Sequence, residues 1–153
     1  MESNNQNLNE FQEKNKKIAN LLVLFNITRN KKLALLALEE LENTSKKMIS
    51  FLLRYENSIK RFKLSKDPEI NMRNFENISQ KNYELLKKET NLIKEILEIS
   101  KIHKNSTMEF TRNEEIVIIG KNQTIKKLSQ QKLSESLTIL EKLLKNLNLK
   151  IKG

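Results

Sequence analysis

The sequence predicts an all-α fold: an elongated antiparallel bundle of long helices with a short irregular or β-hairpin insertion and a C-terminal amphipathic helix. Three observations lead to this prediction. The 153 residues include only two glycines and one proline, so residues that break helices are scarce. Hydrophobic residues make up 37% of the chain and charged residues 31%. The apolar residues recur every three or four positions, as on one face of a helix. We expect a single domain over residues 1–153.

The N-terminal part of the chain divides into two predicted segments. Residues 1–7 are polar and rich in asparagine, and we expect them to be disordered. We expect residues 8–66 to form one long helix or a kinked helix pair, because apolar residues recur at helical spacing along most of this range. The pattern falters at residues 26–30, which fit a kink, a tight turn or a polar stretch of one continuous helix. From Ala34 onward an alternating three–four spacing favours coiled-coil-like packing of long helices.

A second long helix is predicted over residues 67–104. Asp67 can cap its N-terminus, and Pro68 is tolerated in the first helical turn. Asn82 and Glu89 interrupt the apolar stripe of this helix. One reading is that they fix the helix register or make a buried polar contact to a partner. The other is that they lie at the edge of a loosely packed core.

The last third of the chain changes pattern twice. Residues 105–124 contain two short β-prone runs around a polar turn, which predicts an irregular segment or a small hairpin. Residues 125–151 return to helical spacing and form the predicted amphipathic helix. Its leucine stripe either docks on its own bundle or meets a helix of a partner. As the partner-binding site we predict Leu133, Leu137, Leu140, Leu144 and Leu147.

The composition limits the classes of function. The chain has one histidine, one aspartate and no cysteine, and neither glycine lies in a phosphate-binding pattern. We therefore expect a protein without enzymatic activity, catalytic residues, cofactor or metal. His103 lies near a predicted helix C-terminus, where we expect a structural or exposed role. The absence of an apolar leader and of any long apolar run predicts a soluble cytoplasmic protein with no membrane span.

The net charge of +10 raises the question of nucleic-acid binding. The basic excess lies toward both ends of the chain, and the lysines are interleaved with glutamates, as on solvated helix faces. Arginine is rare, and no aromatic stacking motif accompanies the lysines. A protein partner, namely a client helix, is therefore favoured over nucleic acid.

Two sets of residues resemble the long-helix segments of FlgN-type flagellar export chaperones. They are the leucine-rich run over residues 33–41 and the helix that carries residues 82–86 and 91–97. The similarity covers roughly residues 8–104. It implies a bacterial protein-export chaperone of the flagellum that shields terminal helices of a secreted filament-junction protein. The chain departs from the family in being strongly basic, where such chaperones are commonly acidic. No individual functional residue follows from the resemblance.

The sequence thus predicts a protein-binding chaperone or adaptor that is a monomer or a small homo-oligomer. Two alternatives come from other classes of protein. A basic helical protein that associates nonspecifically with nucleic acid would bind less tightly as salt rises. A self-assembling structural helical protein would form large particles.

Overall fold

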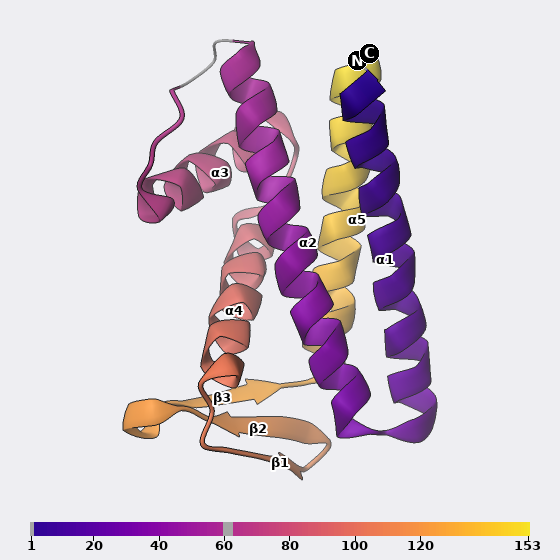
Figure 1. Cartoon of the computed structure of the whole chain (residues 1–153), viewed down its shortest axis with the longest axis vertical. Coiled ribbons are helices and arrows are strands. Elements are labelled where there is room, and N and C mark those ends of the chain that lie inside the picture. Colours follow the sequence, from indigo (N-terminus) through magenta and orange to yellow (C-terminus); the bar gives the residue numbers. More distant parts are fainter. Residues whose placement is uncertain (1, 60–62) are drawn as a thin grey trace.

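The computed structural model describes residues 2–59 and 63–153. Met1 and residues 60–62, which belong to the predicted ranges 1–7 and 8–66, lie outside the described residues. Long helices dominate, and a small antiparallel sheet covers one end of the helical bundle (Figure 1). The elements in chain order are α1 (Glu2–Thr28), α2 (Lys31–Ser58), α3 (Pro68–Asn82), α4 (Lys87–Lys104), β1 (Met108–Arg112), β2 (Glu115–Ile119), the 3₁₀-helix η1 (Lys121–Gln123), β3 (Ile125–Leu128) and α5 (Gln130–Lys152).

The first two helices form an antiparallel hairpin, so the segment at residues 26–30 contains a tight turn. Arg29 adopts a left-handed backbone conformation with φ of 56°. Asn30 then caps α2, because its Oδ1 accepts a hydrogen bond from the Lys32 backbone N–H at 3.0 Å. At the other end, α1 already begins at Glu2. Residues 2–7 are therefore helical rather than disordered, continuing the turn that the buried Leu8 anchors.

The helix predicted over residues 67–104 begins as expected but is two helices. Asp67 caps α3 by accepting a hydrogen bond from the Glu69 backbone N–H at 2.9 Å. The helix ends at Asn82, and Glu84 has φ of 59°. The break buries Tyr83, whose hydroxyl donates to Glu56 on α2 at 2.6 Å. This buried bond holds the turn against α2, and α4 starts in a new direction (Figure 1).

The sheet is larger than the predicted hairpin. β1 and β2 form that hairpin, and the turn residues Asn113 and Glu114 both have positive φ, as two-residue hairpin turns require. β3 then pairs antiparallel with β2. The prediction of helix over residues 125–128 is therefore wrong. Pairing with β2 and burial of Leu128 outweigh the helical spacing, and α5 starts only after Ser129, whose Oγ caps it.

The main core lies between α1, α2 and α5, and it continues to α4 and the inner face of the sheet. α1 and α5 run side by side in opposite directions along the long axis (Figure 1). α3 packs against α2 and α4. Within residues 2–59 and 63–153, no helix combines the length and apolar character that crossing a membrane requires.

Candidate protein-binding surface

The five leucines predicted to bind a partner lie in the core of the bundle. Their exposed fractions are 0%, 7%, 1%, 7% and 0% for Leu133, Leu137, Leu140, Leu144 and Leu147. α5, which carries them, packs against α1, α2 and α4. Of the two alternatives for this stripe, the structure shows docking on its own bundle. In this conformation the five side chains hold the fold together, and a client helix reaches the stripe as a whole only if α5 leaves.

The sheet has one face turned toward the helices. Partner residues in an antiparallel pair point to the same face, and successive residues alternate between faces. Ile116 pairs with Leu128, and Ile118 lies two positions further along β2 on the same face. All three side chains are buried, and both β2 and β3 contact α4. This inner face closes the end of the bundle.

The opposite face of the sheet carries an apolar strip. One row across the three strands consists of Met108, Ile119 and Ile125, and a second row consists of Phe110, Val117 and Lys127. The row next to the hairpin turn is the charged pair Arg112 and Glu115. We call the five apolar residues of these rows the outer face. Met108 is 58% exposed and Ile125 is 57% exposed, while Phe110 and Ile119 are half-buried. An antiparallel sheet with one face in water normally carries polar residues there, so this outer face is suited to contact another protein.

The apolar run in β2 indicates a strand that is covered on both of its faces. β2 has the sequence Glu-Ile-Val-Ile-Ile, with four apolar residues in succession. Strict alternation of apolar and polar residues marks a strand with one solvated face, whereas a continuous apolar run marks a strand covered on both faces. Sequence reasoning identified the run as β-prone but did not assign it a binding role.

The edges of the sheet, formed by β1 and β3, are partly blocked against the addition of a partner strand. On β1, the Glu109 carbonyl oxygen accepts a hydrogen bond from Lys31 Nζ at 3.2 Å. On β3, the Lys127 carbonyl oxygen accepts one from Lys132 Nζ at 3.1 Å. Lysine side chains at exposed edges hinder pairing with further strands. The geometry therefore favours a contact on the face rather than strand addition at an edge.

A polar cluster connects the sheet to the helices. His103 Nδ1, at the end of α4, lies 2.8 Å from Glu109 Oε1 on β1, and His103 Nε2 lies 3.3 Å from Glu39 Oε1 on α2. Ser106 Oγ donates to the same Glu109 oxygen at 2.6 Å. Asp67, the single aspartate of the sequence, is not part of this cluster and caps α3. His103 thus joins three elements and positions the sheet.

Two glutamates form ion pairs that hold the bundle together. Burial alone would raise the pKa of Glu42, but hydrogen bonds and charges from Lys104 and Lys46 outweigh it, and the pKa is lowered. Burial opposes ionisation of Glu89 too, yet Lys142 on α5 and the Leu86 backbone N–H lower its pKa. Glu89 Oε1 lies 2.8 Å from Lys142 Nζ. Glu89, which interrupts the apolar stripe of the predicted helix, therefore makes its contact within the chain.

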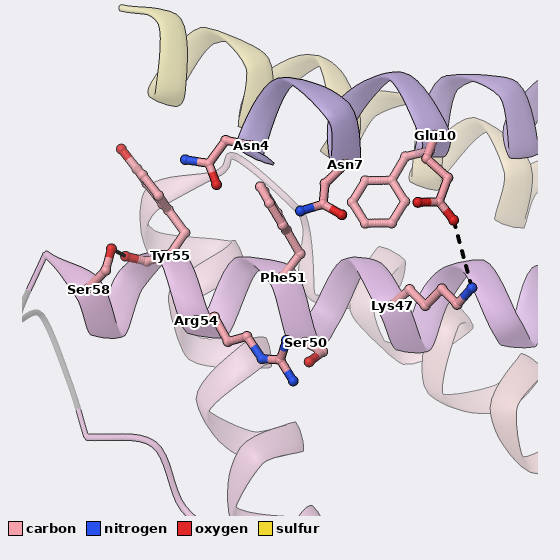
Figure 2. A pocket seen from close by; sticks show the side chains of 10 residues that line it. Asn4, Asn7, Glu10, Lys47, Ser50, Phe51, Arg54, Tyr55 and Ser58 are labelled. Atoms are coloured by element: carbon pink, nitrogen blue, oxygen red, sulfur yellow. Dashed lines mark hydrogen bonds and ion pairs between the residues drawn. The ribbon is translucent and has the colours of Figure 1, made fainter. Parts of the chain in front are cut away.

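A pocket of about 490 Å³ lies between the start of α1 and the end of α2 (Figure 2). Two of its lining residues, Phe51 and Phe11, stand edge-on to each other with ring centroids 5.6 Å apart. Asn4 and Asn7 line the side of the pocket that α1 forms. The other lining residues are Glu10, Lys47, Ser50, Arg54, Tyr55 and Ser58. In the described residues, no group of three or more His, Cys, Asp or Glu side chains is placed to hold a metal ion.

No protein-family model, curated protein or solved structure matches this chain. The fold and the surface define a helical protein whose sheet presents an apolar face at one end of the bundle.

Proposed function

We propose that this chain is a non-enzymatic protein-binding chaperone or adaptor that contacts its partner through the outer face of the sheet. The observation that supports the proposal is the apolar character of that face, with Met108 and Ile125 each more than half exposed. Covering apolar surface contributes about 25 cal/mol for each Å² removed from water. A partner with a matching apolar strip would gain this stabilisation, and the half-buried Phe110 would supply an aromatic anchor.

The resemblance to FlgN-type export chaperones suggests one class of client. In that case the partner is a terminal helix of a secreted filament-junction protein. The mostly helical fold with a long α1–α2 hairpin is compatible with this proposal. Isothermal titration of the chain with the purified junction protein of the same organism tests it directly. Because burial of apolar surface can release almost no heat at one temperature, the titration is made at about 10 and about 35 °C. Absence of heat at both temperatures would reject this client without deciding whether the outer face binds another protein.

The outer face itself is tested by site-specific photo-cross-linking in cells of the source organism. A photoreactive benzoylphenylalanine replaces Ile125 in one variant and Leu86 in the control. Leu86 is also about half exposed, at 51%, but lies outside the sheet. We expect a defined cross-linked protein from position 125, none from position 86, and loss of the product when Met108→Glu is added.

The opposite pattern is informative as well. Equal products at positions 125 and 86, or a product that persists with Met108→Glu, would show that the outer face does not select a partner. The proposal would then be wrong.

A further inference from the structure

A groove of about 580 Å³ lies between the first half of α1 and the last half of α5. The two helices run side by side here, at the end of the molecule opposite the sheet (Figure 1). The volume is in the range of ordinary ligand-binding clefts. Leu8 and Leu144 contribute buried apolar surface, and Leu149 stands at the groove with 64% exposure. Leu144 is one of the five leucines predicted to bind a partner, so this groove gives part of that stripe a route to a ligand.

Asn15 borders the groove and occupies a core position of α1. It follows Phe11 by four residues and precedes Ile18 by three, and both neighbours are buried. Asn15 itself is only 6% exposed. Within residues 2–59 and 63–153, neither its Nδ2 nor its Oδ1 has a hydrogen-bond partner. A buried polar group without a partner costs about 1–3 kcal/mol, so the contact between α1 and α5 is weakened at this point.

The charges of the groove are unbalanced. Of the residues whose side chains the structure describes, the groove is lined by three lysines (Lys16 of α1, Lys145 and Lys152 of α5) and one carboxylate, Glu141. None of the three ammonium groups forms an ion pair in the part of the chain that the structure describes. The other polar residues of the lining are the amides Asn9, Gln12, Asn15 and Asn148. A ligand that supplies carboxylates to the lysines and an apolar side chain to the leucines matches this arrangement.

We propose that the α1–α5 groove binds an acidic, amphipathic peptide segment of a partner protein. The lysines pair with its carboxylates, and Leu144 and Leu149 cover its apolar side. Because the Asn15 amide is closed off from solvent, the segment reaches it by moving α1 and α5 slightly apart, and a backbone or side-chain amide then pairs with it. This site is separate from the outer face, so the chain would hold two protein segments at opposite ends.

Nucleic acid fits the groove less well than an acidic peptide. Among the residues that the structure describes, no aromatic side chain lines the groove to offer a base a stacking partner. Glu141 stands among the lysines and repels a phosphate backbone, whereas a peptide can place a neutral residue opposite it. The Asn15 amide, which has no hydrogen-bond partner within residues 2–59 and 63–153, offers a donor and an acceptor to the alternating acceptors and donors of a polypeptide.

The test uses fluorescence anisotropy at low salt with two labelled synthetic peptides. One peptide is an amphipathic helix of leucine and glutamate, and the other has lysine in place of glutamate. We expect wild type to bind the acidic peptide only. The double variant K16E/K145E should bind it at least about tenfold more weakly, since two attractive charges become repulsive. The control K87E/K121E makes the same change in net charge at exposed positions outside the groove, and its affinity should stay within about twofold.

Asn15→Leu separates binding from folding. Leucine removes the unpaired amide and fills a core position, so we expect Tm to rise by about 2–4 °C. The same change should weaken peptide binding, because the two helices separate less easily and no amide is offered. A structural role alone would raise Tm and leave the affinity unchanged.

Several results would overturn the proposal. One is that wild type does not bind the acidic peptide. Another is that K16E/K145E and its control lower the affinity for this peptide equally. A third is that Asn15→Leu leaves that affinity unchanged. A labelled single-stranded oligonucleotide provides a further outcome. If it binds more tightly than the acidic peptide and K16E/K145E abolishes that binding, the groove is a nucleic-acid site instead. Because these variants leave the outer face intact, their failure does not affect the cross-linking test at Ile125.

Discussion

At the scale of single residues, the buried ion pairs of α2 have the clearest physical consequence. Glu42 is 2% exposed, yet its carboxylate is charged because Lys104 and Lys46 both contact it. A buried carboxylate without such partners would be strongly disfavoured. The pair between Glu42 and Lys104 connects α2 to the end of α4, close to His103 and the sheet. Its loss should therefore loosen the connection between the helices and the sheet.

The lowered pKa of Glu42 predicts how stability depends on pH. Its pKa in the folded state lies below the value of 4.5 that applies to an unperturbed glutamate. The unfolded chain therefore takes up protons more readily, and the free energy of unfolding decreases as pH falls from about 5 through the folded-state pKa. Glu89 acts in the same direction. Urea denaturation at neutral pH and between about pH 3 and 5 measures this effect.

Glu42→Gln provides the matched variant. At neutral pH we expect it to lower the free energy of unfolding by about 1.5–3 kcal/mol, the usual worth of a hydrogen bond to a charged group. The difference from wild type should shrink as pH falls, since wild-type Glu42 becomes neutral as well. A difference that is independent of pH would contradict this interpretation.

At the scale of elements, the break between α3 and α4 stores backbone strain at Glu84. This residue has φ of 59° and is exposed. Left-handed conformations are unfavourable for residues with a Cβ atom but not for glycine. We expect Glu84→Gly to raise the free energy of unfolding by about 1 kcal/mol. Thermal unfolding of this variant measures the gain. Glu114→Gly, in the hairpin turn at φ of 65°, should behave alike, and destabilisation of both variants would argue against these turn conformations.

The docking of α5 can be tested at the same scale. Leu140 is 1% exposed in the core, so Leu140→Ala should lower the free energy of unfolding by about 2–5 kcal/mol. Leu149→Ala, on the exposed side of the same helix, should change it by less than about 0.5 kcal/mol. Urea denaturation of both variants gives the comparison. If Leu140→Ala cost as little as Leu149→Ala, α5 would spend much of its time away from the bundle.

The sequence predicted some elements well because their signals are local. Asp67 and Pro68 mark a helix start within two residues. The break at Glu84 was missed because neither glycine nor proline marks it, and the apolar spacing continues through it. The third strand was missed because Ile125 and Leu128 are three residues apart and fit a helix as well as a strand. Only pairing with β2 decides between them.

Whether the leucines of α5 are a binding site could not be read from their spacing. An amphipathic stripe looks the same whether it docks on its own bundle or on a partner. The outer face was missed for a related reason, because the faces of β2 are defined only once β1 and β3 pair with it. The groove beside Asn15 depends on the approach of α1 and α5 from opposite ends of the sequence.

At the scale of the whole molecule, the apolar outer face and the net charge of +10 have opposite effects on association. The apolar face favours contacts, while the shared positive charge keeps copies apart. The dye ANS reports accessible apolar surface. We expect M108E/I125E to lower ANS fluorescence at neutral pH relative to wild type. I70E/L86E, which adds the same charges at exposed apolar positions elsewhere, should lower it much less. Equal fluorescence in the two double variants would show that the outer face is not the main accessible apolar surface.

The start of α1 and the end of α5 lie side by side at the end of the bundle that is farthest from the sheet (Figure 1). A surface tether or fluorescent protein fused at either position would therefore leave the sheet facing the surrounding solution. A short linker could also join the two positions, so that new ends are opened in the η1 turn beside the sheet. A domain appended to the new ends would then lie close to the outer face. If that addition alone abolished partner capture, it would map the contact to this end of the molecule without altering a side chain of the sheet.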